Sequence, residues 1–326
     1  MKKIRRILII SLVLAMTVSL VACAGGPSGN TSAGEPTSVA SERPRVGIVL
    51  GGGGETGVAW QTGVLAALAD QAGLTPDVVD VVVGTSAGAV SGSYFSAGLD
   101  LNELVEKERS GDVMTVPLES GGGMSAIPQE LIAALSATEG TIEERNKVIG
   151  QLALKASPPI SGADFVNYVT SMLSGAEWPE SDFRITSVNA ETGATVLWKR
   201  ADGVPLAAAI ASSVAVPGFL PAIEINGQHY TDAPRASFSA SLVAEKDLNV
   251  IVYIGMPTPN LSNTIEEEAL TKLEAEGLKV VRITGGDGSE ELIRDALNPE
   301  LRPRAAEMGL RDGEAAAQSV AKLLQQ

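Results

Sequence analysis

The sequence predicts an α/β protein of three layers, in which helices cover both faces of a mostly parallel central sheet. Two apolar runs, at residues 46–50 and 78–83, are typical of buried strands, and each leads through a glycine-rich turn into a helical pattern. Sequential βα units of this kind build parallel sheets, and their sites form at the carboxyl ends of the strands. We therefore expect the two glycine-rich turns to meet at one edge of the sheet.

The first turn offers a row of backbone N–H groups. Gly52, Gly54 and Gly57 have the spacing G-x-G-x-x-G between a strand and a helix, which also matches a dinucleotide-binding fingerprint. That fingerprint requires an acidic residue at the end of the second strand, and Asp77 and Asp80 come too early. Both interpretations share consecutive N–H groups at a helix N-terminus, which bind an anion or a developing oxyanion.

The second turn, Gly84-Thr85-Ser86-Ala87-Gly88, places a serine between strand and helix. This is the pattern of a nucleophile elbow, where glycines on both sides let the chain reverse and project the hydroxyl above the sheet. The alternative is a turn of small residues that only packs a helix against the sheet.

A serine nucleophile needs a base, and the chain has a single histidine, His229. His229 lies on the second strand of a predicted hairpin with an Asn226-Gly227 turn, which is typical of a structural or exposed residue. Asp232, at the end of that strand, is better placed to reach a shared site. A carboxylate accepts the serine proton if its surroundings bring its pKa toward the working range.

The remaining elements follow from periodicity and from glycine and proline breaks. The stretch 99–183 loses the strand pattern, and its helices form either a lid or acyl-chain wall over the site or an ordinary helical layer. The Gly121-Gly122-Gly123 triplet is interpreted as a loop. Helices are predicted at 58–72, 87–97, 129–135, 146–155 and 305–324, and a further strand at 278–283.

These motifs together resemble the patatin-like phospholipase family. The resemblance covers residues 46–256 and includes the glycine loop, the serine elbow, and the stretches 183–193, 211–221 and 230–232 in the family's order. It implies a patatin-like fold and an acyl hydrolase with a Ser-Asp dyad, without metal or organic cofactor. Ser86 would be the nucleophile, Asp232 the proton acceptor, and Gly52, Gly53, Gly54 and Gly57 the oxyanion loop, with Gly84 and Gly88 as the elbow glycines.

Two departures from the family pattern concern this site. Thr56 stands where the family usually has a basic residue, and Glu55 adds a negative charge beside it, so we expect weaker activity toward anionic phospholipid. Ala233 and Pro234 replace a glycine turn after Asp232, and proline biases Ala233 toward extended geometry. A degenerate, binding-only protein of the envelope that retains the fold is therefore an alternative to an enzyme.

Residues 1–22 have the pattern of a bacterial lipoprotein signal peptide. Four basic residues precede an apolar stretch at 7–20 that is short for a membrane span, and small residues lead to Cys23, the only cysteine. We expect Cys23 to be lipidated and residues 23–44 to form a flexible tether, since they are rich in Gly, Pro, Ser and Thr. The predicted location is the bacterial cell envelope, outside the cytoplasm, with the membrane as a partner through this anchor.

The rest of the chain, residues 45–326, is predicted to be one acyl hydrolase domain with core motifs at 46–256 and a helical C-terminal part at 259–326. Removal of the four basic signal residues takes the net charge from −15 to −15 − 4 = −19. Such a charge disfavours nucleic acid and is repelled by anionic bilayers. The predicted partner is a lipid or other fatty acyl ester, and an acyltransferase with the same acyl-enzyme is an alternative to a hydrolase.

Overall fold

The computed structural model describes residues 43–115, 129–232, 237–257 and 262–325. The signal peptide, Cys23, the tether, the Gly121-Gly122-Gly123 triplet and the Ala233-Pro234 turn predicted from the sequence lie outside these residues. No helix in the described part combines the length and the apolar character needed to span a membrane.

An eight-stranded sheet forms the middle layer, in the order β5-β6-β3-β2-β1-β7-β8, with β4 paired to β3. Strands β3, β2, β1, β7 and β8 run parallel, and β4, β5 and β6 add antiparallel pairs at one end. The strands are β1 (Val46–Leu50), β2 (Val81–Gly84), β3 (Phe183–Asn189), β4 (Thr195–Lys199), β5 (Ile223–Ile225), β6 (Gln228–Thr231), β7 (Val250–Ile254) and β8 (Lys279–Ile283). The α/β fold with a mostly parallel sheet, predicted from the sequence, is confirmed.

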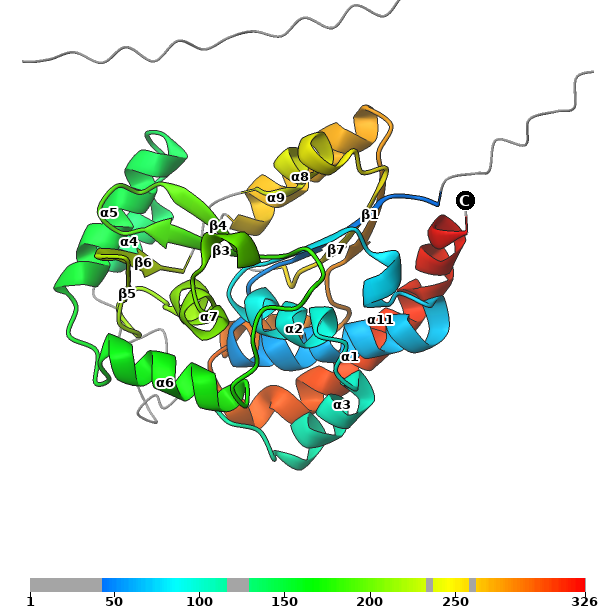
Figure 1. The fold of residues 1–326 in the computed structure, drawn as a ribbon, viewed down its shortest axis with the longest axis horizontal. Coiled ribbons are helices and arrows are strands. Elements are labelled where there is room, and N and C mark those ends of the chain that lie inside the picture. Colours follow the sequence, from blue (N-terminus) through cyan, green and yellow to red (C-terminus); the bar gives the residue numbers. More distant parts are fainter. Residues whose placement is uncertain (1–42, 116–128, 233–236, 258–261, 326) are drawn as a thin grey trace, which may run out of the picture. The chain divides into compact units, whose positions relative to one another are not determined.

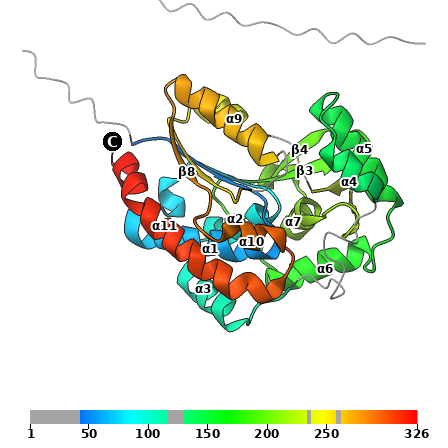
Figure 2. The same ribbon diagram turned by 180° about the vertical axis from the view of Figure 1, so that it is seen from behind.

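Helices cover both faces of this sheet (Figures 1 and 2). Helices α8 and α9 lie on one face, whereas α1, α2, α3 and α11 lie on the other. The helices are α1 (Gly54–Ala72), α2 (Ala87–Ser96), α3 (Leu101–Ser110), α4 (Gln129–Ser136), α5 (Ile142–Lys155), α6 (Gly162–Met172), α7 (Leu206–Val214), α8 (Ser239–Lys246), α9 (Ser262–Ala275), α10 (Ser289–Arg294) and α11 (Arg302–Leu324). Short 3₁₀ turns occur at Pro76–Val78, Arg200–Asp202 and Pro299–Leu301.

Two apolar cores separate the layers. The larger core packs β1, β2 and β3 against the helices around α1 and α11, and the smaller one packs the other face of β1, β2 and β7 against α8. Glycines let α1 and α11 approach closely: a Cβ added at Gly309 would lie 2.0 Å from the carbonyl oxygen of Trp60, and one at Gly63 would lie 2.3 Å from that of Ala306. The C-terminal helix is therefore fixed directly against the helix that follows the first glycine loop.

Several element boundaries differ from the sequence predictions. Strand β2 begins at Val81, since Pro76–Val78 forms a 3₁₀ turn and the Asp80 carboxylate accepts from the backbone N–H of Val46 at 2.7 Å. Helix α5 begins at Ile142 rather than at residue 146, because the preceding threonine and Glu144 form a capping box. Helices α1 and α11 also begin earlier than predicted, at Gly54 and Arg302.

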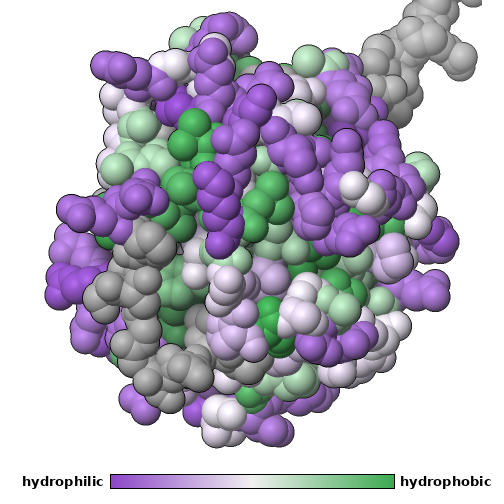
Figure 3. Space-filling model, turned by 90° about the vertical axis from the view of Figure 1, so that its left-hand side faces the viewer, coloured by the Kyte–Doolittle hydropathy of each residue, from purple (hydrophilic) through white to green (hydrophobic). Residues whose placement is uncertain are grey.

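The end of the molecule that holds α4, α5 and α6 exposes apolar side chains. Figure 3 looks onto this end and shows apolar residues at the surface between polar ones. The exposed large apolar side chains of the described residues include four on α4 and α5, namely Ile132, Ile142, Val148 and Leu154.

Candidate active site

Ser86 occupies a sharp turn between β2 and α2. It is a non-glycine residue with φ 54° and ψ −117°, and it is 7% exposed. Such a backbone conformation costs about 1–3 kcal/mol and persists where the surrounding structure enforces it, most often at functional sites. The turn thus holds the serine in the strained geometry expected of a nucleophile elbow.

The glycines that flank Ser86 are required by close contacts. A Cβ at Gly84 would lie 2.1 Å from the carbonyl oxygen of Gly88, and a Cβ at Gly88 would lie 2.4 Å from that of Leu50. Any other residue at either position would push α2 away from β1 and β2. Their role in the structure is to let strand, turn and helix pack without an intervening side chain.

The first glycine loop lies beside this elbow. A Cβ at Gly52 would be 3.5 Å from the Cβ of Ser86, and the N–H of Gly88 donates to the carbonyl of Gly51 at 3.2 Å. The Gln61 amide also donates to the Gly51 carbonyl at 2.7 Å, while Ser91 donates to Gln61 at 2.6 Å. The two motifs, separate in the sequence, therefore form one buried unit at the carboxyl ends of β1 and β2.

The register of the sheet brings the ends of β2 and β6, which lead to Ser86 and Asp232, to one stretch of β3. Gly84 pairs with Ile185 and Thr231 pairs with Val188, so the two strands end on opposite sides of β3. Parallel and antiparallel neighbours of one strand can thus deliver two side chains to one edge. Asp232 is half-buried.

The C-terminal end of α7 contacts both residues. The N–H of Ser86 donates to the Ser213 hydroxyl at 2.9 Å, and the N–H of Asp232 donates to the Ala215 carbonyl at 3.1 Å. Both partners belong to the stretch 211–221 on which the family resemblance partly rests. One short segment thus fixes the backbone of the two predicted dyad residues.

His229 is engaged elsewhere. Its Nδ1 lies 2.7 Å from Oε1 of Glu191, and its side chain is 40% exposed on the hairpin. Burial raises the pKa of Glu191, but the hydrogen bonds and charge of His229 outweigh this and lower it. The hairpin turn is as predicted, with positive φ at both Asn226 and Gly227. Neither His229 nor Asp232 is among the described residues that line the pocket at Ser86.

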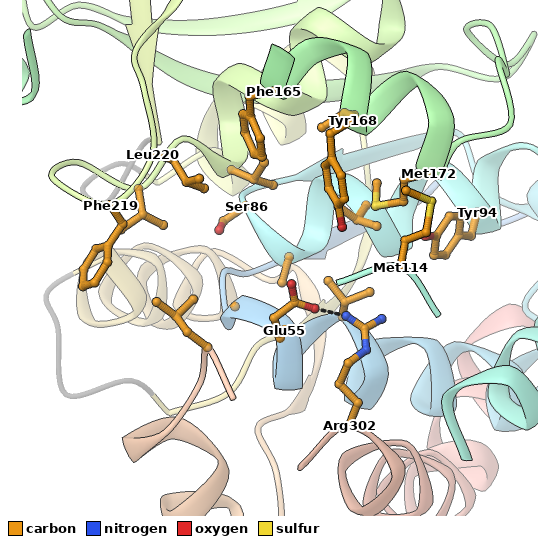
Figure 4. Close-up of a pocket in the computed structure, with 18 residues that line it drawn as sticks. Glu55, Ser86, Tyr94, Met114, Phe165, Tyr168, Met172, Phe219, Leu220 and Arg302 are labelled. Atoms are coloured by element: carbon orange, nitrogen blue, oxygen red, sulfur yellow. Dashed lines mark hydrogen bonds and ion pairs between the residues drawn. The ribbon is translucent and has the colours of Figure 1, made fainter. Parts of the chain in front are cut away.

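Ser86 opens onto a largely apolar pocket (Figure 4). Phe165, Tyr168 and Met172 of α6 form one wall, so this part of the helical stretch 99–183 serves as a pocket wall. Gly54 is the one member of the predicted oxyanion loop among the described lining residues. The other apolar lining residues are Val58, Ala87, Val90, Met114, Val169, Val214, Val216, Phe219, Leu220 and Leu297. A pocket with this lining suits a hydrocarbon chain.

The charge of Glu55 is not the isolated negative charge that the sequence suggested. Arg302, at the start of α11, forms an ion pair with Glu55 and binds both oxygens of Glu108 on α3, at 2.7 and 2.5 Å. All three side chains are buried. Arg302 therefore supplies a cation near the first glycine loop, from a part of the chain that the sequence motifs did not include.

Thr56 points away from the pocket. It is fully buried, and its hydroxyl donates to the carbonyl of Leu292 at 3.0 Å, at the end of α10. Its N–H donates to the carbonyl of Ala296 at 3.1 Å. The residue that replaces the family's basic side chain thus ties the glycine loop to the C-terminal part of the chain.

A family comparison covers the part of the chain that holds both glycine motifs and Asp232. The model of the family described as patatin-like phospholipase matches residues 48–234, more than half of the chain. The chain belongs to this family. Patatin-like phospholipases are lipid acyl hydrolases, and this membership makes the protein an enzyme of that class. None of the curated proteins matches it.

Solved structures resemble this patatin-like protein at low identity. VipD from Legionella pneumophila is 13% identical, with a TM-score of 0.45, over 85% of this chain and 67% of VipD. The human GIVD cytosolic phospholipase A2, solved with methyl gamma-linolenyl fluorophosphonate, is 13% identical with a TM-score of 0.42, over 86% of this chain and 58% of that one. ExoU, in its complex with SpcU from Pseudomonas aeruginosa, is 17% identical with a TM-score of 0.34, over 83% of this chain and 53% of that one.

The described residues contain no group of three or more histidine, cysteine or carboxylate side chains that could hold a metal ion. Sequence reasoning identified the two glycine motifs and Asp232, but it missed Arg302, Glu108 and Tyr168 as neighbours of the site. Arg302 lies at the start of an alanine-rich helix whose charged residues are typical of a solvent-exposed face. No local pattern distinguishes it from the other arginines of that helix.

Proposed function

We propose that this enzyme hydrolyses fatty acyl esters of lipids with Ser86 as the nucleophile and Asp232 as the base. The observation that carries the proposal is the strained Ser86 turn at the mouth of an apolar pocket, beside a loop of backbone N–H groups. The turn presents the serine as a nucleophile, the loop offers donors to an oxyanion, and the apolar pocket suits the acyl chain, so each feature supports acyl transfer through serine.

In the proposed mechanism, the Ser86 hydroxyl attacks the ester carbonyl and the Asp232 carboxylate accepts its proton. The negative charge that develops on the carbonyl oxygen is stabilised by N–H groups of Gly52, Gly53 and Gly54. Collapse of the tetrahedral intermediate leaves the acyl group on Ser86 and releases the alcohol, to which Asp232 returns the proton. Water, deprotonated by Asp232, then attacks the acyl-enzyme; the bond to Ser86 breaks, the fatty acid leaves, and Asp232 returns the proton to the Ser86 oxygen.

The assignment of the base is supported by the arrangement around β3. Asp232 directly follows β6, which pairs with β3 as β2 does, whereas His229 is engaged with Glu191 on the hairpin. In this proposal a carboxylate takes the role that a histidine has in other serine hydrolases.

Three variants test this assignment in the purified enzyme with nitrophenyl esters and with a bacterial lipid extract. Ser86→Ala is expected to lower kcat by about 10³-fold or more, since removal of the nucleophile of a catalytic unit has effects of that order or larger. Asp232→Asn is expected to have a comparable effect, and His229→Ala a small one. Full activity of Ser86→Ala, or collapse of a normally folded His229→Ala, would overturn the proposal.

Acyl transfer is the second candidate, because the acyl-enzyme reacts with water or with another alcohol by the same chemistry. Product analysis distinguishes the two: free fatty acid is expected as the main product in the presence of a competing alcohol. An excess of the new ester would show an acyltransferase. Binding of lipid extract without any turnover in either assay would show the binding-only protein.

We further propose that the enzyme is a lipoprotein of the bacterial cell envelope, anchored through Cys23. The basic, apolar and small-residue order of residues 1–22 before the single cysteine supports this. The expected result is incorporation of labelled palmitate into the wild-type protein and none into Cys23→Ser. Equal labelling of both proteins, or none in either, would exclude the anchor.

A further inference from the structure

Polar side chains converge inside the otherwise apolar pocket at Ser86. Figure 4 shows Phe165 and Tyr168 on one side and Glu55 with Arg302 on the other, with the Tyr168 hydroxyl directed into the space between them. All four residues line the pocket. An acyl chain that extends from Ser86 into this pocket therefore passes polar groups rather than an entirely hydrocarbon wall.

The Tyr168 hydroxyl is buried and has no hydrogen-bond partner among the residues that the structure describes. Its burial raises the pKa of the phenol, and the negative charge of Glu55 raises it further, so the group is neutral and keeps its proton. A buried hydroxyl without a partner has a free-energy cost, because it has given up its hydrogen bonds to water. A ligand that supplies a partner recovers this cost, and a ligand that does not leaves it in place.

The ion pairs opposite Tyr168 disfavour an anionic partner. Arg302, the cation among the described lining residues, already binds the carboxyl groups of Glu55 and Glu108, so an anion placed here would meet a cation that two other groups share. A carboxylate or phosphate placed here would be repelled and stripped of water. A neutral hydroxyl can accept from Tyr168 and donate toward the carboxylate side of the cluster, and it needs no counter-ion.

We propose that the pocket selects acyl chains that carry a hydroxyl group part-way along the chain, which binds to the hydroxyl of Tyr168. The inference rests on the proposed function, because it assigns this pocket to the acyl group held by Ser86. The preferred substrates are then esters of hydroxylated fatty acids, and Tyr168 is a specificity-determining residue.

The test compares nitrophenyl esters of fatty acids that bear a single hydroxyl at successive carbons with the plain ester of the same length. For one hydroxyl position the wild-type enzyme is expected to show a kcat/KM about 10-fold or more above that for the plain ester, since a site built to hydrogen-bond a hydroxyl discriminates against an analogue that lacks it. In Tyr168→Phe this ratio is expected to fall to about one.

Tyr253→Phe is the matched control. The hydroxyl of Tyr253 is also buried without a partner among the described residues, but it lies on β7 in the smaller core and does not line the pocket. This variant is expected to keep the wild-type ratio. Loss of the ratio in both variants, or its retention in Tyr168→Phe, would overturn the inference.

A binding assay separates this inference from the catalytic one. Displacement of a fluorescent fatty acid from Ser86→Ala is expected to favour one hydroxylated fatty acid over the plain acid by about 10-fold. Equal affinities overturn the hydroxyl selectivity even if the enzyme hydrolyses both esters. Selective binding without hydrolysis in the wild type supports the pocket assignment and contradicts the proposed catalysis.

Discussion

Two buried arginines, Arg184 and Arg302, each bind two carboxylates, and their surroundings differ. Arg184 on β3 binds Glu245 of α8 through two bonds of 2.7 Å and Asp182 at 2.9 and 3.1 Å. The side chains of Glu245 and Asp182 are 54% and 26% exposed. Arg302, by contrast, joins two carboxylates that are almost entirely buried, and its own side chain reaches the pocket.

This difference indicates two separate roles for similar sets of residues. The Arg184 cluster connects the sheet to α8 with carboxylates that water can still solvate. The Arg302 cluster joins α1, which follows the first glycine loop, to α3 and α11, and its side chains are almost entirely buried. Since an unpaired charge is costly where water cannot reach it, the second cluster is the more sensitive to disruption.

Arg302→Leu is expected to have the largest effect. The variant leaves Glu55 and Glu108 buried without their cation, and breaking such an ion pair costs about 3–5 kcal/mol. Denaturant unfolding monitored by circular dichroism measures this loss, and ester hydrolysis is expected to fall with it because the glycine loop and α1 share the cluster. A loss of unfolding free energy below about 1 kcal/mol would show that this buried cluster stabilises the fold no more than a surface ion pair does.

Gly309→Ala is expected to cause the second largest loss of unfolding free energy, because it displaces the helix that carries Arg302. The added methyl group would lie 2.0 Å from the Trp60 carbonyl oxygen, so α11 has to move away from α1. Overpacking of this kind costs about 1–3 kcal/mol. The control has to be a glycine without a positive φ, which rules out Gly277, because its φ of 104° is strained for any residue with a side chain. Gly162→Ala is the matched control, because Gly162 has no positive φ and an added Cβ would lie 3.4 Å from the Ala222 carbonyl oxygen, an ordinary contact; an equal loss there would contradict the account.

Arg184→Leu is expected to lower the free energy of unfolding by less, about 1–2 kcal/mol, because solvent screens the carboxylates that Arg184 binds. Hydrolysis per folded molecule is expected to stay within about two-fold of the wild type, because this cluster lies on the opposite face of the sheet from the pocket. Activity measured beside a thermal melt checks both parts. A loss of activity larger than that of Arg302→Leu would reverse the proposed division of roles.

The smallest expected effect is a pH dependence confined to the Arg184 cluster. The hydrogen bond from Arg184 lowers the pKa of Glu245, and for Asp182 the bonds from Arg184 and Lys246 outweigh burial and lower it too. An acid whose pKa is lower in the folded protein than in the unfolded chain stabilises the fold fully above its unfolded-state pKa, which is near about 4. This stabilisation is lost as the pH falls through the lower, folded-state pKa. The stability difference between wild type and Arg184→Leu is therefore expected to shrink below about pH 4. A difference that grows on acidification would contradict these pKa directions.

The comparison also shows what the sequence could and could not predict. Strand β1, the Ser86 turn and the Asn226-Gly227 hairpin depend on neighbouring residues, so local patterns predicted them well. The Arg302 cluster depends on contacts across 194 and 247 residues, which no local pattern records. The same limit explains why the sequence showed Glu55 beside the glycine loop but not its ion pair with Arg302.

The central claim is that Ser86 is the nucleophile, and covalent labelling tests it most directly. The purified protein is treated with a fluorophosphonate that carries an alkyl chain, then digested, and the modified peptide is identified by mass spectrometry. A single adduct on Ser86, absent from Ser86→Ala, is the predicted result. An adduct on another residue, or equal labelling of the Ser86→Ala variant, would contradict the account.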